Sequence, residues 1–172
     1  MKKTTLLAIL LAGLSFCCKK SNSSASYHLT ATIDGQARAF NTNLTATWAG
    51  SNIAFSGASS ATSSPGEELL FALIGSPQQP SFPVGSYPDT ASGFDVQATY
   101  RQTLTSQYEA GTPTAGTALV TGKTITNHFT LIITAIDTVS IKGTFSGDYF
   151  LDGSPANAKV TITNGDFYAK FR

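Results

Sequence analysis

The chain has 172 residues, and its 11 lysines and arginines nearly balance its 10 aspartates and glutamates, so the formal net charge is +1. This balance, with no basic run in the body of the chain, excludes the electrostatic footprint of a nucleic-acid-binding protein. The length suits one domain with its own core. The 2 cysteines are sequence neighbours, which excludes a disulfide framework.

The N-terminal segment has the parts of a secretory signal peptide. A basic start, Met1-Lys2-Lys3, is followed by an apolar run, Thr4–Phe16, and then by Cys17 and Cys18. The apolar run is shorter than the roughly 20 residues that span a bilayer. Because both cysteines lie where cleavage would occur, we predict a bacterial lipoprotein signal, in which a cysteine becomes the acylated first residue of the mature chain.

Either cysteine could be the acylated one. Cleavage before Cys17 places Leu14 at the usual apolar position but bulky Phe16 at the cut, whereas cleavage before Cys18 leaves a small residue there. We therefore predict a signal peptide over residues 1–17 and acylation of Cys18, with Cys17 as the alternative. An ordinary secretion signal with two incidental cysteines is a further alternative.

Residues 18–26 are predicted to be a lipidated flexible tether, and residues 27–172 the folded domain. The tether lacks aromatic and branched apolar residues, so we expect it to be disordered. The residues after the cysteines are basic and polar rather than acidic, which disfavours export to the cell surface. We therefore expect a protein of the bacterial cell envelope, held in the outer membrane by its lipid and facing the periplasm.

The first half of the domain is predicted to consist of hairpins. Alternating apolar and polar residues over Tyr27–Ile33 predict a strand, and Asp34-Gly35 predicts a tight turn to a return strand. The next strand carries Trp48 on its apolar face and pairs back with residues 53–56. Leu69–Ile74 is apolar on both faces, which indicates a central strand.

The middle of the chain contains more loop. Within the proline-rich stretch Gly75–Gly93, Phe82–Tyr87 is predicted to be the anchored part. Phe94–Arg101 alternates and predicts another strand. Ala110–Gly116 is predicted to be a turn-rich connection.

The longest regular pattern runs over His128–Tyr149, as two strands joined at Asp137-Thr138. On the second strand, apolar residues and glycines recur at every second position from Val139 onward, which predicts a half-buried strand with that face inward. Further along, Asn164-Gly165 predicts a type I′ turn before the last strand.

The predicted fold class is all-β. No stretch after residue 18 shows a helical period, and strand patterns separated by turn residues recur throughout the domain. This arrangement is typical of a single antiparallel β-sandwich, or a flattened barrel, of about ten strands.

Four stretches of turns and strand faces carry a resemblance to a known group of proteins. They are Thr32–Gly35, Phe82–Tyr87, Ile141–Gly147 and Val160–Phe167. In these stretches the chain resembles small uncharacterised lipoproteins of the Bacteroidota. The resemblance implies an all-β domain of unknown function on an envelope lipoprotein, and it brings no catalytic residues to transfer.

Two groups of side chains could bind a metal ion. His28 and His128 could meet across neighbouring strands, with Asp95 or Asp148 as a further ligand, but surface histidines on strands are the simpler interpretation. Asp148, Asp152 and Asn157 could line a calcium loop, although Asp and Asn are also the usual turn residues. Adjacent Glu67 and Glu68 should point to opposite faces and so form no carboxylate pair.

Aromatic side chains could bind a ligand such as a glycan. Tyr87 and Tyr108 lie in or beside predicted loops and are the preferred candidates. Trp48 is a further candidate, although it shares a face with Leu44 and Ala46 and is predicted to lie in the core.

These observations favour a non-enzymatic binding or structural module that needs no cofactor. It would present the loops Ala58–Gly66 and Gly75–Gly93 to a protein or glycan partner, and its lipid would hold it on the membrane. A glycan-binding module using Tyr87, Tyr108 or Trp48 is the first alternative. A metal-dependent enzyme built on the two histidines is the second.

Overall fold

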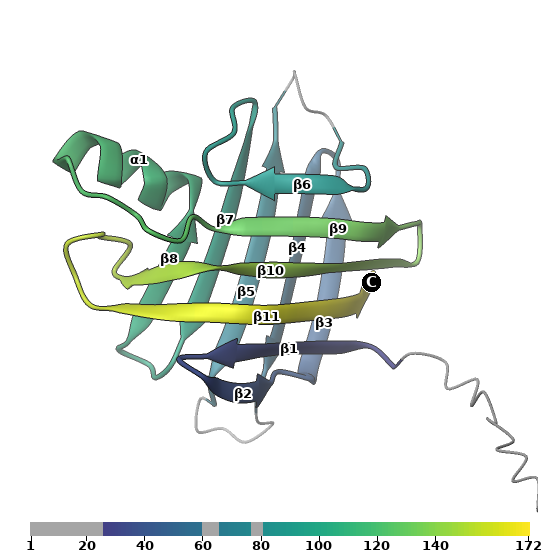
Figure 1. Cartoon of the computed structure of the whole chain (residues 1–172). Helices are drawn as coiled ribbons and strands as arrows, with labels where there is room; N and C mark the ends of the chain where they lie inside the picture. The colour runs from purple at the N-terminus through teal and green to yellow at the C-terminus, as the bar shows by residue number, and fades with distance from the viewer. Residues whose placement is uncertain (1–25, 60–65, 77–80) are drawn as a thin grey trace, which may run out of the picture.

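The computed structural model describes residues 26–59, 66–76 and 81–172 of the chain (Figure 1). These residues form an antiparallel sheet of 11 strands and one helix, which confirms the predicted all-β class. The predicted signal peptide, both cysteines and nearly all of the tether fall on residues 1–25, outside the described residues.

The strands range from short edge pieces to two long strands near the C-terminus, and the helix lies between the eighth and ninth strands. Their bounds are β1 (His28–Ile33), β2 (Gln36–Ala39), β3 (Thr42–Ala49), β4 (Asn52–Ala58), β5 (Glu68–Gly75), β6 (Gly85–Pro88), β7 (Phe94–Arg101), β8 (Gln107–Gly111), α1 (Thr112–Thr121), β9 (Thr130–Ile136), β10 (Ser140–Leu151) and β11 (Lys159–Lys170).

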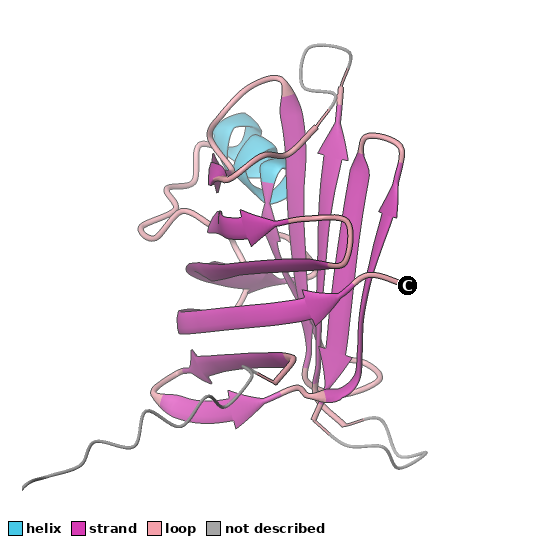
Figure 2. Cartoon of the chain, turned by 90° about the vertical axis from the view of Figure 1, so that its right-hand side faces the viewer, coloured by secondary structure: helices cyan, strands magenta, loops and turns pink. Residues whose placement is uncertain are grey.

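The sheet folds over on itself into two layers. Its order is β2-β1-β11-β10-β8-β7-β5-β4-β3, and β9 pairs with β10 on one side and with β6 on the other. In Figures 1 and 2 the layer of β6, β9, β10, β11, β1 and β2 crosses the layer of β8, β7, β5, β4 and β3 at a steep angle. The architecture is therefore a sandwich with nearly orthogonal layers, or half of a flattened barrel.

Two corners join the layers. At one corner β10 belongs to both, because it pairs with β9 through residues 141–146 and with β8 through Phe150 and Leu151. At the other corner the end of the chain reaches β3, where Phe171 bridges to Ala46 and the Arg172 N–H donates to the Ala46 carbonyl at 3.1 Å. The core lies between these corners.

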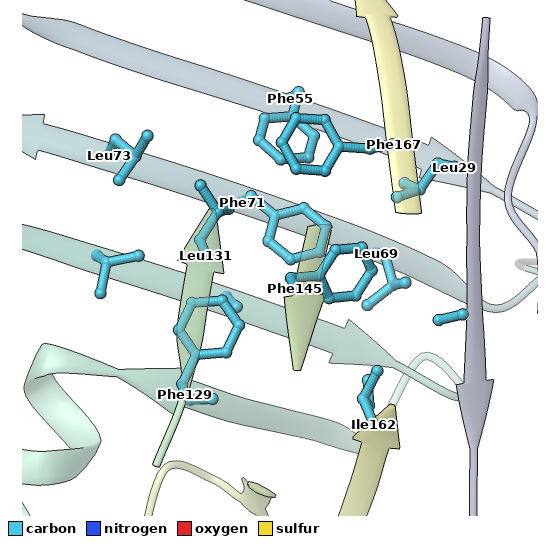
Figure 3. Packing of buried hydrophobic residues seen from close by; sticks show 14 of the residues in the cluster. Leu29, Phe55, Leu69, Phe71, Leu73, Phe129, Leu131, Phe145, Ile162 and Phe167 are labelled. Atoms are coloured by element: carbon cyan, nitrogen blue, oxygen red, sulfur yellow. The ribbon is translucent and has the colours of Figure 1, made fainter. Parts of the chain in front are cut away.

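Stacked phenylalanines from both layers fill the centre of the core (Figure 3). The Phe55 ring lies 4.6 Å from that of Phe71 and 4.4 Å from that of Phe167, and Phe71 lies 4.5 Å from Phe145. All four come from alternating positions that the sequence pattern directs inward. Offset stacking of this kind adds to the stability that burial of the rings provides.

The inward face of β10 follows the predicted alternation along most of its length. Ile141, Phe145 and Tyr149 are buried, and the intervening Gly143 leaves space for the carbonyl of Ile132 on β9. Val139, which the pattern also placed inward, is half exposed because it lies in the turn before the strand begins.

Asn164-Gly165 is a bulge within β11, so the predicted turn is wrong. Phe145 faces Gly165 while Gly147 faces Ile162, so two residues of β11 oppose one of β10 at this point. Asn164 adopts a φ of 50°, which is the conformation that makes Asn-Gly a turn signal. A bulge needs the same conformation, and local sequence does not distinguish the two.

Helix α1 replaces the connection predicted at Ala110–Gly116. Pro113 lies in its first turn and Gly122 ends it with a φ of 65°, which are ordinary start and stop residues. Its threonines and Gly116 are weak helix formers, so a helical period is hard to see in the sequence. Packing decides the conformation, because Ala115 and Ala118 are buried in a small cluster with Ile125 and Phe150.

Candidate functional site: the groove beside helix α1

A groove of about 550 Å³ lies between α1 and two segments of the other layer, residues 89–91 and 123–128. This volume is within the range of small-molecule sites. Its walls are mainly apolar and come from Ala91, Ala115, Gly116, Ala118, Leu119 and Ile125. Helix α1 stands out from the sandwich at the left of the view in Figure 1.

The polar end of the groove holds a histidine and a buried aspartate. The Nδ1 atom of His128 lies 2.9 Å from Oδ1 of Asp89, and Oδ2 of Asp89 accepts the Phe129 N–H at 3.0 Å. The Asp89 side chain is 2% exposed and that of His128 is 43% exposed. Asp89 therefore orients the imidazole through Nδ1, and the partly exposed ring lines the groove.

The positions of both residues follow from strand pairing. Asp89 comes directly after β6 and His128 lies two residues before β9, and these two strands are neighbours in the sheet. The Asp89 N–H donates to the Phe129 carbonyl at 2.9 Å, which continues the ladder past the ends of the strands. The pair is thus built on hydrogen-bonded backbone at a sheet edge.

Burial is the main influence on the charge of Asp89. It raises the pKa of this carboxyl above its ordinary value, while the Phe129 N–H and His128 act in the opposite direction and offset only part of the effect. Partnership with the imidazole is what makes a carboxylate acceptable at this depth. Lys123 adds a second basic side chain to the groove lining.

A histidine oriented by an aspartate is also the base half of a hydrolytic triad, which needs a nucleophile on the other side of the ring. The groove hydroxyls belong to Thr90, Thr112 and Thr124. Of these, Thr112 accepts a hydrogen bond from the Val96 N–H at 3.1 Å. Among the described residues, the hydrogen-bond partner of the His128 ring is Asp89.

The two histidines do not come together. The Nε2 atom of His28 lies 2.6 Å from Oδ2 of Asp166 on β11, whereas His128 pairs with Asp89. Neither Asp95 nor Asp148, the ligands considered from sequence, is the partner of either ring. Within the described residues, no group of three or more His, Cys, Asp and Glu side chains is arranged to hold a metal ion.

Asp148 belongs to a buried polar network rather than to a calcium loop. Its carboxylate accepts hydrogen bonds from Lys159 at 2.7 Å, Thr161 at 2.8 Å and Asn127 at 3.2 Å. Asn157 instead donates its side-chain N–H to the carbonyl of Leu151 and so belongs to a turn.

Glu67 and Glu68 take separate partners. Glu67 pairs with Arg38 at 3.2 Å and accepts the Tyr100 hydroxyl at 2.9 Å, while Glu68 pairs with Arg101. They form no joint carboxylate site, in agreement with the prediction that adjacent residues point to opposite faces.

The three aromatic candidates for ligand binding lie in different environments. Tyr87 is buried, and its hydroxyl donates to the Pro83 carbonyl at 2.5 Å, so it is unavailable as a binding surface. Tyr108 is half buried and stacks on Tyr100 with ring centroids 6.1 Å apart. Trp48 is 46% exposed, so its predicted core position is wrong. It lies near the end of the edge strand β3, where Phe171 covers one side of its ring.

Sequence reasoning identified His128 but missed Asp89 and the whole of α1. Asp89 lies in a proline-rich stretch, 39 residues before its partner, where an aspartate is an ordinary loop residue. Recognising that Gly85–Pro88 forms a strand beside β9 would have brought the two together. Parts of both predicted partner loops, residues 60–65 and 77–80, lie outside the described residues.

No protein-family model matches the chain, and no curated protein or solved structure matches it either. In the part of the chain that the structure describes, α1 is too short to be a membrane-spanning helix.

Proposed function

We propose that the chain is an envelope lipoprotein of the Bacteroidota, and that its domain is a non-enzymatic module binding a small amphipathic anion in the groove beside α1. The lipoprotein part is supported by the leader, the cysteines and the resemblance of four stretches of sequence. The ligand class is supported by the composition of the groove, which is mainly apolar and whose lining includes the His128–Asp89 pair and Lys123.

The observation that carries the proposal is the His128–Asp89 pair at the end of an apolar groove. When the imidazole is protonated, its Nδ1–H stays on Asp89 and its Nε2–H points away from that carboxylate. A carboxylate or phosphate head would accept this hydrogen bond, and Lys123 adds a positive charge to the lining of the same groove. An apolar body would cover Ala115, Ala118 and Leu119 on α1.

A titration of octanoate against the full chain in lipid nanodiscs, with empty nanodiscs as the blank, tests this assignment. Saturable binding is expected, and His128→Ala should weaken it about tenfold or more, because a hydrogen bond to a charged group is lost. His28→Ala is the matched control, since His28 also pairs with an aspartate but lies outside the groove. Equal weakening in both variants, or no saturable binding, would contradict the proposal.

A further inference from the structure

An exposed aromatic and basic surface lies at the edge where the end of β11 meets β3. We name it the tether-side patch and define it by Tyr27, Trp48, Lys170, Phe171 and Arg172. Trp48 is 46% and Tyr27 41% exposed, and Lys170 and Arg172 are also exposed. Large exposed aromatics gathered with basic residues are a sign of an interaction surface.

The tether-side patch is held in place by the corner of the sandwich. The Tyr27 ring lies 4.7 Å from that of Tyr168, and the Trp48 ring lies 5.6 Å from that of Phe171. A hollow of about 340 Å³ beside them is lined by Tyr27, Leu44, Lys170, Phe171 and Arg172. The Arg172 N–H donates to the Ala46 carbonyl, so the chain end is fixed on β3. The aromatic rings therefore form a supported platform.

The composition of this platform fits the interface of a lipid bilayer. Tryptophan and tyrosine concentrate at the level of lipid headgroups, because each has an apolar body and a polar tip. Lysine and arginine beside them can reach lipid phosphates while their stems cover apolar surface. The nearby carboxylate of Asp137 is held in its ionised form by the N–H groups of Val139 and Ser140, so it sets one negative charge against the two positive charges of Lys170 and Arg172.

The length of chain before the domain points to the same partner. Tyr27 follows Cys18 by nine residues (27 minus 18). Since an extended chain spans at most about 3.5 Å per residue, an acyl group on Cys18 keeps Tyr27 within about 30 Å of the bilayer surface. In Figure 1 β1 begins and the chain ends on the right of the molecule, while α1, which lines the groove, lies on the left.

We propose that the tether-side patch seats the domain on the lipid bilayer, with Trp48 and Tyr27 at the headgroup level and Lys170 and Arg172 on lipid phosphates. This inference rests on the lipid anchor of the proposed function, but not on the ligand of the groove. Seating through this patch turns the α1 groove away from the membrane.

Trp48 is the one tryptophan of the chain, so its fluorescence reports on the patch alone. The acylated full chain is reconstituted in vesicles of phosphatidylcholine and phosphatidylglycerol, with and without bromine atoms on the upper acyl chains. We expect strong quenching of Trp48 by the brominated lipid. A domain that moves freely on its tether would leave the emission unquenched, and this outcome would overturn the proposal.

Charge variants test the role of the basic residues. In Lys170→Gln/Arg172→Gln, the ratio of bilayer-seated to unseated domains, read from the quenched and unquenched parts of the Trp48 emission, should fall about thirtyfold. Each basic residue near an anionic surface contributes about fivefold to this ratio. Lys123→Gln, at the groove, is the matched control and should leave the ratio unchanged. An equal response to Lys123→Gln, or a Trp48 response to peptidoglycan in place of bilayers, would overturn the assignment.

Acylation is measured in the same samples by mass spectrometry. Acylated chain without quenching contradicts the seating surface while leaving the lipoprotein proposal intact. Absence of acylation contradicts the proposed anchor, and quenching of such unacylated chain would still support the patch as a bilayer-binding surface.

Discussion

The carboxylate of Asp148 is fully buried, although the sequence pattern places Asp148 on the solvent-facing side of β10. Burial alone would raise its pKa, but hydrogen bonds from Lys159, Thr161 and Asn127 together outweigh burial and hold the pKa below its ordinary value. The carboxylate is therefore favoured in the folded state. Asp148 is a structural residue whose charge contributes to stability.

We expect Asp148→Asn to lower the free energy of unfolding by about 2 kcal/mol near neutral pH, because the buried carboxylate loses its charge-assisted hydrogen bonds from the partly exposed Lys159 and from Thr161. Urea unfolding followed by circular dichroism measures this loss. Asp152→Asn is the matched control, since Asp152 is exposed in a turn at a φ of 53°, which asparagine accepts, and it should change stability by less than about 0.5 kcal/mol.

The pH dependence has a definite sign. A carboxyl group whose folded pKa is depressed contributes its stability above the unfolded pKa, which is about 3.9, and loses it as the pH falls through the folded value. The advantage of the wild type over Asp148→Asn should be constant above about pH 5 and shrink below pH 4. An advantage that grows on acidification would contradict the assignment of the network.

At the scale of elements, Gly143 allows β9, β10 and β11 to pack closely. A Cβ atom there would meet the Ile132 carbonyl of β9 and the Phe167 ring of β11 at well under contact distance. Because that carbonyl belongs to the strand backbone and the ring is buried in the core, neither can move cheaply.

Gly143→Ala should destabilise the protein by about 2 kcal/mol or more through overpacking. The same substitution at Gly116 in α1 is the control, because its Cβ would enter open space, and it should stabilise the helix by up to about 1 kcal/mol. Opposite shifts in the midpoint of urea unfolding are expected for the two variants. Shifts of the same sign would show that the tight contact at Gly143 is not decisive.

Element by element, the sequence predicted what depends on neighbouring residues. The alternation in β1, β7 and β10 and the turns at Asp34 and Asp137 are local signals, and the structure has them. Helix α1 and the bulge at Asn164 depend on contacts with other strands, so local patterns mispredicted both. The His128–Asp89 pair lies between these cases, because one partner was recognised and the other depends on the pairing of β6 with β9.

At the scale of the whole molecule, the proposed function requires that the domain is anchored to the membrane through an acyl group on Cys18. Labelling of producing cells with radioactive palmitate should give a labelled band for the wild type and for Cys17→Ala, and none for Cys18→Ala. The physical reason is that a thiol at the first mature position is the group that becomes acylated. The reverse pattern would move the anchor to Cys17, and a band in both variants and in the double variant would contradict acylation of either cysteine.

The groove beside α1 has walls that belong to different layers of the sandwich. Helix α1 continues directly from β8 and packs on β7 and β8, whereas Asp89 and His128 extend β6 and β9 of the opposite layer. Within the described residues, the strand pairing that joins these layers at that corner is that of β10 with β8, through Phe150 and Leu151. The groove therefore lies where the two layers meet, and an apolar occupant would extend the contacts that Ala115 and Ala118 already make with Ile125 and Phe150.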